Sequence, residues 1–213
     1  MNTKEIRDYK KTLNLTDIQR SILIGTLLGD GHLETQDNGK TYRLKIEHQL
    51  LQIDYLEWLH DQFKEWIGGG IKHRIKKNNK EYVLFNTYSH GAFRFYAQQF
   101  YVNRKKIIPK LICKFLDPIA LAIWYMDDGS WKSNHHKTFI IHTVGFVKKD
   151  LELVQTTLKS KFGIETSLHK QKEKYWRLYI KSESAELFRK IIEPYTLKFP
   201  SMQNKMGNIM PKK

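Results

Sequence analysis

Two stretches of nine residues decide the fold of this chain: LIGTLLGDG at residues 23–31 and LAIWYMDDG at residues 121–129. In each, an apolar segment ends in an acidic residue followed by glycine. The apolar positions of the first stretch occupy most of the circumference of a helix, as in a helix that is buried on nearly all sides. Each stretch therefore predicts a buried helix with a carboxylate, Asp30 or Asp128, at its C-terminal end.

Both helices have start signals upstream. Thr16 can cap the first helix, and Gln19, three residues later, completes a capping box. Asp117 can cap the second helix, and Pro118 suits the first helical position, where the missing N–H costs nothing. The predicted helices therefore begin at these caps and run into the two Asp-Gly pairs.

The same order of elements follows each helix, as alternating apolar residues, turn residues and amphipathic segments indicate. The predicted strands are 32–36, 42–48, 71–77 and 81–88 in the first half, and 130–134, 138–145, 165–171 and 175–181 in the second. Further helices are expected at 53–67, 92–101, 149–162 and 183–192. The sequence thus predicts an α+β fold of two pseudo-symmetric αββαββα repeats, with paired central helices and two curved antiparallel sheets that form a saddle. The N-terminal repeat covers 1–102, a linker 103–116 and the C-terminal repeat 117–213.

The charge of the chain narrows its partners. There are 37 Lys and Arg against 22 Asp and Glu, a net charge of +15, and such an excess indicates a polyanion such as nucleic acid. Codon bias in an AT-rich genome is the alternative, although it does not readily unbalance basic and acidic residues. The apolar runs are far shorter than the roughly 18 to 20 residues that a bilayer crossing needs, so no membrane partner is expected. The single cysteine, Cys113, excludes an internal disulfide and a Cys-rich zinc site, and it fits the interior of a bacterium or an organelle.

An aspartate at the C-terminus of an apolar helix is electrostatically unfavourable, because the helix dipole there costs it about 0.3 to 1 kcal/mol. Its recurrence at matching points of a repeat indicates a cation that offsets the repulsion; two ordinary Asp-Gly turns are the alternative. Helices packed side by side would bring Asp30 and Asp128 together, and Gly25 and Gly29 permit a close approach. Two carboxylates with few other ligands suit Mg²⁺, which keeps several waters and accepts phosphate oxygens. Metal-assisted phosphodiester hydrolysis is the chemistry that such a site favours.

The two stretches resemble the two motif copies of the single-chain LAGLIDADG homing endonucleases. The resemblance spans nearly the whole chain, because the spacing of the motifs and the strands after each also fit. It implies a monomeric, site-specific endonuclease that hydrolyses double-stranded DNA at a long, non-palindromic target. The implied cofactor is Mg²⁺, with Mn²⁺ as a substitute and Ca²⁺ as an ion that binds without supporting cleavage.

The resemblance also assigns roles within the motif. The catalytic acid of the family holds the eighth position, which is Asp30 and Asp128 here, and both are expected to bind the metal. Asp127, at the seventh position, is expected in a helix-packing or backbone role, and it is grouped with Gly29 at the metal site. Ile123 stands where the family prefers a small residue, so an asymmetric contact with Gly25 is expected.

One basic residue per half is implied near the phosphates to be cut. The segments 103–109 and 199–205 resemble those that supply such lysines, which nominates Lys106, preferred over Lys105, and Lys205. A lysine there can neutralise the transition-state phosphate or polarise the attacking water; an ordinary phosphate contact is the alternative. Structural roles are expected for Glu47, Gln49 and Gln52, near the first helix pair.

Outward strand positions and turn residues are expected to contact DNA, most of them through phosphates that carry no sequence information. They are Glu34, Gln36, Lys40, Arg43, Lys45, Lys72, Arg74, Lys76, Lys80 and Asn86 in the first half, and Lys132, Asn134, His136, Lys137, His142, Lys170, Lys172, Lys174, Arg177 and Lys181 in the second.

Two other functions compete with the endonuclease. The same fold can serve as a maturase that binds its own intron RNA, or as a non-cleaving DNA- or RNA-binding protein. A protein that no longer cleaves would be free to lose its acids, and both acids are present, which favours the enzyme. A plain basic RNA-binding protein with a coincidental repeat is the remaining alternative.

Overall fold

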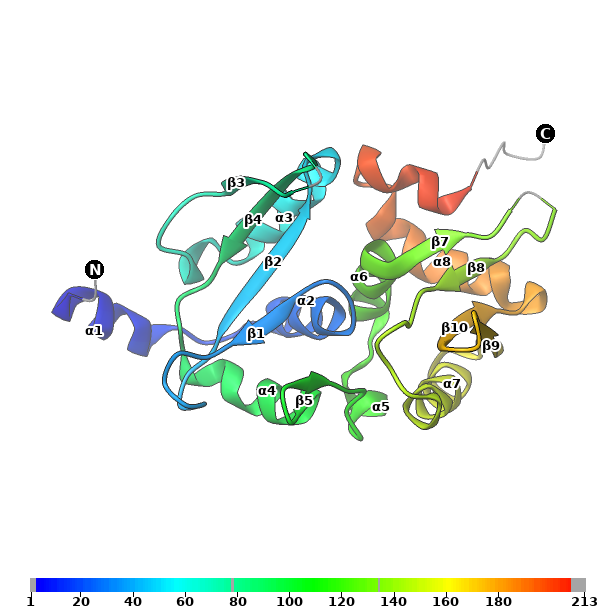
Figure 1. Cartoon of the computed structure of the whole chain (residues 1–213), viewed down its shortest axis with the longest axis horizontal. Coiled ribbons are helices and arrows are strands. Elements are labelled where there is room, and N and C mark those ends of the chain that lie inside the picture. The colour runs from blue at the N-terminus through cyan, green and yellow to red at the C-terminus, as the bar shows by residue number, and fades with distance from the viewer. Residues whose placement is uncertain (1–2, 78, 134, 208–213) are drawn as a thin grey trace.

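Two helices, α2 (Asp17–Leu28) and α6 (Pro118–Asp128), lie side by side at the centre of the computed structural model, which describes residues 3–77, 79–133 and 135–207 (Figure 1). Their predicted caps are confirmed. The Gln19 backbone N–H donates to the Thr16 hydroxyl over 3.2 Å, and the Gln19 side chain accepts from the Thr16 N–H over 3.0 Å. Asp117 accepts from the Ala120 N–H over 2.7 Å. These caps set the residue at which each helix begins.

The contact between α2 and α6 leaves no room for side chains at two glycines. A Cβ added to Gly25 would stand 2.7 Å from the Ala120 carbonyl oxygen and 2.7 Å from the Cβ of Ile123. A Cβ on Gly29 would collide with the side chain of Asp127. The asymmetric contact expected between Gly25 and Ile123 is therefore present, and it lets the two helix ends meet.

A four-stranded antiparallel sheet follows each central helix, and the strand order is the same in both. The first sheet has the order β1-β2-β4-β3, with β1 (His32–Glu34), β2 (Arg43–Gln49), β3 (Lys72–Ile75) and β4 (Glu81–Asn86). The second has the order β7-β8-β10-β9, with β7 (Gly129–Trp131), β8 (Phe139–Ile141), β9 (Thr166–Gln171) and β10 (Tyr175–Ile180). The predicted repeat and fold class are confirmed.

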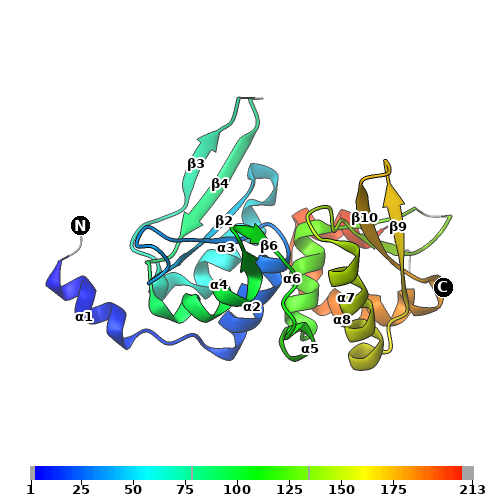
Figure 2. The same cartoon turned by 60° about the horizontal axis from the view of Figure 1, so that its bottom comes forward.

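Helices cover one face of each sheet and leave the other open. The covering helices are α3 (Ile53–Gln62), α4 (Arg94–Phe100), α7 (Lys148–Phe162) and α8 (Ala185–Thr196). Alternation along the strands selects the face: in β2, Leu44, Ile46 and His48 are buried, while the residues between them are half-buried on the other side. In Figure 2 the helices lie below, and the hairpins β3–β4 and β9–β10 rise above them, one in each half.

Several short elements escape the sequence patterns. The helix expected over 53–67 ends at Gln62, and the 3₁₀ turn η2 (Lys64–Trp66) follows, where the buried Trp66 indole donates to Gln19 over 3.2 Å. The other 3₁₀ turns are η1 (Leu50–Gln52), η3 (Gly91–Phe93) and η4 (Ser182–Ser184), which lie between the main elements, and η5 (Pro200–Met206), which follows α8. Helix α1 (Lys4–Thr12), which buries no residue, was not expected from the sequence. The stretch expected as a linker holds α5 (Ile112–Phe115) and β6 (Lys105–Lys106), which pairs with β5 (Tyr101–Val102).

Among the described residues no helix is long and apolar enough to span a membrane.

The close approach at Gly25 predicts whether a substitution there raises or lowers the stability of the protein. Replacing glycine by alanine inside a helix ordinarily stabilises it by roughly 0.5 to 1 kcal/mol. Here the added methyl meets backbone and side-chain atoms of α6, so Gly25→Ala is expected to lower the free energy of unfolding by about 1 to 3 kcal/mol in urea titrations. Gly91→Ala, whose Cβ would meet open space in η3, is the matched control. A stabilised Gly25→Ala protein would contradict this account of the helix contact.

Candidate active site at the ends of the paired helices

The two motif acids stand where α2 and α6 end. Asp30 follows α2 and Asp128 is the last residue of α6. Burial and then the neighbouring Asp30 raise the pKa of Asp128 to about 7. Burial also raises the pKa of Asp30, while Lys205, Lys106 and Lys76 oppose that rise. Burial therefore disfavours the charged form of both carboxylates, and the charge of Asp30 adds to the effect at Asp128.

Two lysines from distant segments reach these helix ends. The Lys106 ammonium donates to the carbonyl oxygens of Gly29 and Gly31, over 2.7 and 2.8 Å. The Lys205 ammonium donates to the carbonyl oxygens of Met126 and Asp127, the latter over 3.1 Å. Carbonyls at a helix C-terminus have no partner within the helix and attract cations, so each lysine satisfies the end of one central helix. Burial lowers the pKa of both lysines, and the nearby carboxylates oppose that shift.

Asp127 joins the two helix ends. Its Oδ2 accepts the backbone N–H of Asp30 over 3.0 Å, and its Oδ1 accepts the Tyr55 hydroxyl over 3.0 Å. The side chain is fully buried, and burial raises its pKa well above the ordinary value, with Asp30 and Asp128 adding to the rise. Asp127 thus contacts the backbone of the first motif, and the structure places Asp30, Asp128, Lys106, Lys205, Asp127 and Gly29 together.

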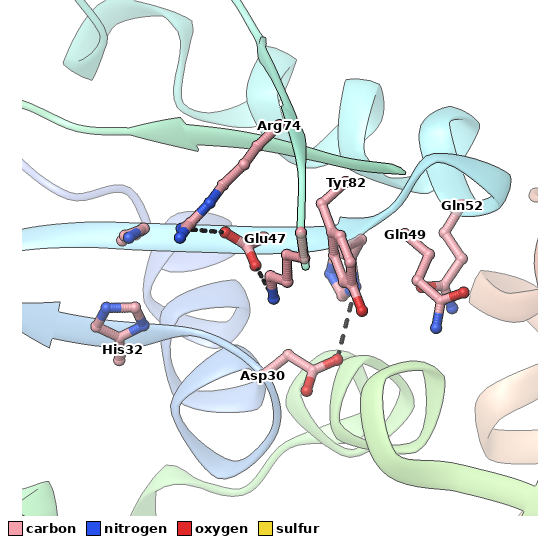
Figure 3. Close-up of a pocket in the computed structure, with 10 residues that line it drawn as sticks. Asp30, His32, Glu47, Gln49, Gln52, Arg74 and Tyr82 are labelled. Atoms are coloured by element: carbon pink, nitrogen blue, oxygen red, sulfur yellow. Dashed lines mark ion pairs between the residues drawn. The ribbon is translucent and has the colours of Figure 1, made fainter. Parts of the chain in front are cut away.

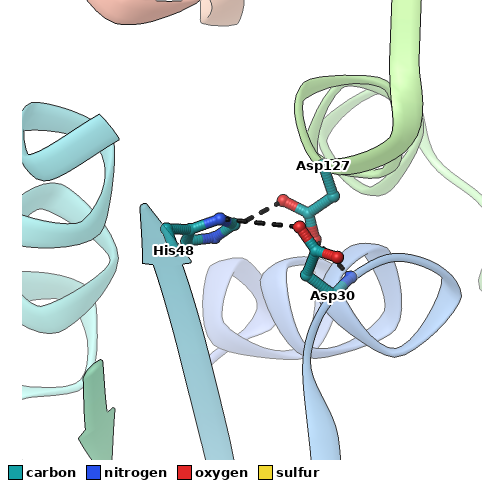
Figure 4. A group of neighbouring side chains, drawn as sticks. All are labelled: Asp30, His48 and Asp127. Carbon is teal, nitrogen blue, oxygen red and sulfur yellow. Dashed lines mark hydrogen bonds and ion pairs between the residues drawn. The ribbon is translucent and has the colours of Figure 1, made fainter. Parts of the chain in front are cut away.

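His48 is a site residue that the sequence reasoning treated as part of the strand core. From β2 the His48 ring points between Asp30 and Asp127. Its Nδ1 lies 3.6 Å from Asp30 Oδ2, and its Nε2 lies 3.8 Å from Asp127 Oδ1 (Figure 4). Its ring lies 5.1 Å from that of Tyr55. Burial lowers the pKa of His48 to about 4, so the imidazole is neutral at pH 7. The sequence signal that could have identified His48 as a site residue is its polar side chain at an inward-facing position of an alternating strand.

A cavity of about 420 Å³ opens above Asp30 on the open face of the first sheet (Figure 3). Glu47 stands in it with Oε2 3.6 Å from the Arg74 guanidinium, and it also pairs with the Lys76 ammonium. Of the expected DNA contacts, Lys45, Arg74 and Lys76 line this cavity. So do residues for which structural roles were expected, namely Glu47, Gln49 and Gln52.

Strand register places most of the expected first-half contacts on the open face of the first sheet. Lys45 lies opposite His32 on one side and Asn86 on the other, so all three share a face. Glu34, Arg43, Lys72 and Arg74 fall on that same face, and the Arg43 Nε lies 2.6 Å from the Glu34 carboxylate. Gln36 and Lys40 lie between β1 and β2, and Lys80 precedes β4.

Strand register divides the expected contact residues of the second sheet between its two faces. Arg177 and His142 lie on the open face, as does Lys132, whose ammonium is 5.3 Å from the centre of the Tyr179 ring. Lys170 pairs with Trp176, which packs on the core, so the register places Lys170 on the opposite face of the sheet from Arg177. The reason is the two-residue period of a strand, because Leu168 on the same strand already faces inward. The Lys170 side chain is nevertheless exposed, with the ammonium 3.0 Å from the Glu173 carboxylate.

The other expected contacts of the second half lie in turns or at strand ends. Lys172 and Lys174 stand in the β9–β10 turn, where Lys172 has a positive φ of 49°. His136 and Lys137 lie between β7 and β8, and Asn134 is outside the described residues. The ammonium of Lys181, after β10, is 3.9 Å from carboxylate oxygens of both Glu165 and Glu183. Register also places residues on the open faces that the sequence reasoning missed, among them His32, Tyr82, His169, Gln171, Tyr175 and Tyr179.

The arrangement of two matched sheets around paired acidic helix ends has counterparts among known proteins. Residues 20–188 match the profile of the LAGLIDADG DNA endonuclease family, and the chain belongs to that family. A probable intron-encoded endonuclease of Wickerhamomyces canadensis is 32% identical, over 96% of this chain and 91% of that protein. A solved structure of the homing endonuclease I-WcaI bound to its DNA recognition sequence matches with a TM-score of 0.86 at 29% identity, over 98% of this chain and 95% of that one.

Another relative of this chain is named a maturase, not an endonuclease. The cytochrome b mRNA maturase bI2 of Saccharomyces cerevisiae is 31% identical over 98% of this chain. The chain spans only 51% of that maturase's length.

The raised pKa of Asp128 leads to a prediction about stability and pH. Its folded-state pKa of about 7 lies above the value of about 3.9 in an unfolded chain. The stability it contributes is therefore complete below about pH 4 and is lost as the pH rises through about 7. We expect Asp128→Asn to stabilise the metal-free protein relative to wild type, with a gain that grows by more than about 1 kcal/mol from pH 5 to pH 8. Urea unfolding in a chelator measures this gain, and Glu57→Gln, at an exposed position of α3, is the control. A stability gain that does not change with pH would contradict the raised pKa of Asp128 in the folded protein.

Proposed function

We propose that this chain is a site-specific, metal-dependent DNA endonuclease that cuts both strands of a long, non-palindromic target as a monomer. The observation that carries the proposal is the convergence of Asp30, Asp128, Lys106 and Lys205 at the ends of the paired helices, between two open sheet faces. Membership of the LAGLIDADG DNA endonuclease family and the net charge of +15 support it.

The donor set fits a hard divalent ion. Both carboxylates have raised pKa values, and the charge of Asp30 adds to the rise at Asp128, so a cation between them would relieve the repulsion. Mg²⁺ binds through one or two carboxylates while keeping waters and phosphate oxygens. Asp30 and Asp128 are the proposed ligands, and Gly29 and Asp127 belong to the same site through their backbone contacts. We propose that Mn²⁺ substitutes and that the larger Ca²⁺ binds without supporting cleavage. When bound, such an ion makes an attacking water more acidic and stabilises the leaving oxygen.

The residues of the chain supply orientation and charge. Each lysine is held by two carbonyl oxygens at its helix end, so its ammonium is fixed beside the acids before DNA arrives. There it can neutralise one scissile phosphate and its developing negative charge, a form of preorganised electrostatic stabilisation. The two unequal sheets would each read one half of the target, with arginine, lysine, asparagine and glutamine contacting base edges or phosphates.

A maturase function is the second candidate, because a relative that matches 98% of this chain is named a maturase. This function would make the host intron RNA a second partner. It predicts that Asp30→Asn protein still supports splicing of that RNA, since folding an intron requires no phosphodiester hydrolysis by the protein.

The endonuclease proposal is tested on a pooled DNA library with Mg²⁺. Wild type is expected to cut one long site, whereas Asp30→Asn and Asp128→Asn are expected to bind that site and lose at least about 10³-fold in cleavage rate, or roughly 4 kcal/mol of barrier. Binding by gel shift in Ca²⁺ and cleavage in Mg²⁺ are measured on the same preparations. Cleavage that survives both substitutions would overturn the proposal.

The lysines are tested against an adjacent control. Lys106→Met and Lys205→Met are each expected to slow cleavage by about 10²-fold with target binding largely retained. Lys105→Met removes the exposed neighbour of Lys106, which lies outside the helix-end contacts, and is expected to leave the cleavage rate near wild type. Equal losses in Lys105→Met and Lys106→Met would assign both residues to general phosphate binding.

A further inference from the structure

His48 is buried without the partners that a buried imidazole ordinarily has. Its side chain is 1% exposed, and neither ring nitrogen makes a hydrogen bond of ordinary geometry within the described part of the chain. The nearby Gln52 side chain raises the pKa of the ring only weakly against the larger effect of burial. Buried polar groups are nearly always satisfied, and each exception in a folded protein calls for an explanation such as an unseen ion. The ring is aimed between two carboxylates, which offers such an explanation (Figure 4).

The three side chains have the spacing of a metal centre. One ligand atom each from Asp30, His48 and Asp127 lie within 4.8 Å of one another. A tetrahedral ion held about 2.0 to 2.2 Å from nitrogen and oxygen ligands places those ligands about 3.4 Å apart. A single ion takes one ring nitrogen, and Nε2 is the one that faces the buried Asp127. The Asp30 side chain, which is 48% exposed and now lies beside Nδ1, can rotate toward Nε2. We propose that Asp30, His48 and Asp127 form a binding site for a transition-metal ion such as Zn²⁺, Co²⁺ or Cu²⁺.

The surroundings of the three residues are those of a metal site. Asp127 is held by the Tyr55 hydroxyl on Oδ1 and by the Asp30 N–H on Oδ2, and ligating carboxylates are ordinarily fixed by such outer hydrogen bonds. The His48 ring lies against Tyr55 and is carried by a central strand of the sheet. Both Asp30 and His48 line the 420 Å³ cavity, which provides an entry path and room for water in the remaining coordination positions (Figure 3).

The nitrogen donor separates this site from the proposed Mg²⁺ site. Mg²⁺ prefers carboxylate, carbonyl and water oxygens, whereas imidazole suits zinc and the later transition metals. The inference goes beyond the proposed function because it requires neither DNA nor cleavage. It shares Asp30 with the Asp30–Asp128 pair, so an ion held by His48 would draw Asp30 away from Asp128 and compete with Mg²⁺.

The first experiment uses the unaltered protein and one equivalent of Cu²⁺, an ion that imidazole suits. Pulsed electron paramagnetic resonance of the complex is expected to show the hyperfine coupling of a directly bound imidazole nitrogen. His142→Gln, which removes the half-buried histidine on the second sheet, is the matched control and is expected to keep the signal. Absence of nitrogen coupling in wild type, or its loss in the control alone, would overturn the proposal.

The second experiment measures affinity with Co²⁺, whose visible absorption reports tetrahedral coordination, and with Zn²⁺ by calorimetry. His48→Gln is expected to weaken binding of both ions at least tenfold and to abolish the Co²⁺ absorption, while Mg²⁺ affinity changes by less than threefold. Circular dichroism confirms that the variant is folded, and the Cu²⁺ spectrum of wild type decides the question if it is not. Asp128→Asn is expected to retain Co²⁺ binding.

The outcomes distinguish the two proposals. Co²⁺ binding that is lost in Asp128→Asn but intact in His48→Gln would place the ion on the Asp30–Asp128 pair and overturn the histidine site while leaving the proposed endonuclease unaffected. Failure of wild type to cut DNA in Mg²⁺ would overturn the endonuclease and leave the Co²⁺ and Cu²⁺ results unchanged.

Discussion

The contact between α2 and α6 is the constraint on which the rest of the molecule depends. Gly25 lies against Ala120 and Ile123, and Gly29 lies against Asp127, so the helices approach more closely than larger residues would allow. At the other end of the pair, the Ser21 hydroxyl donates to Asp117, the cap of α6. Because each acid stands at the end of its helix, the separation and register of the two helices set the geometry of the site, and the sheets follow from the strands that leave it.

Unfavourable electrostatics are concentrated at the end of this helix pair. Burial raises the pKa of Asp30, Asp127 and Asp128, so their charged forms are disfavoured together. Lys106 and Lys205 oppose that effect and also satisfy the free carbonyls of the helix ends. Perturbed groups of opposite sign, gathered between two open sheet faces, are typical of a functional site, where stability is sacrificed for chemistry.

The pseudo-symmetry of the repeat breaks at the site itself. Gly29 stands at the motif position that Asp127 occupies in the second copy, and the two meet because one has no side chain and the other has a buried one. Asp127 reaches across to the Asp30 N–H and to Tyr55, and His48 completes that side. The half around Asp30 therefore has an additional network of polar side chains, and this is where a nitrogen ligand is available.

The sequence by itself determined the elements and the acids. Helix caps, two-residue alternation and Asp-Gly ends are local signals, and they were sufficient for the repeat, the order of helices and strands along the chain and the placement of Asp30 and Asp128. Family resemblance added Lys106 and Lys205. Only the tertiary structure decided that His48 and Tyr55 join Asp127, residues 79 and 72 positions away in the chain, and that Lys170 shares a face of its sheet with Trp176 and not with Arg177. The reason is physical: alternation says which residues share a face, but helix packing and strand register decide which distant residues that face meets.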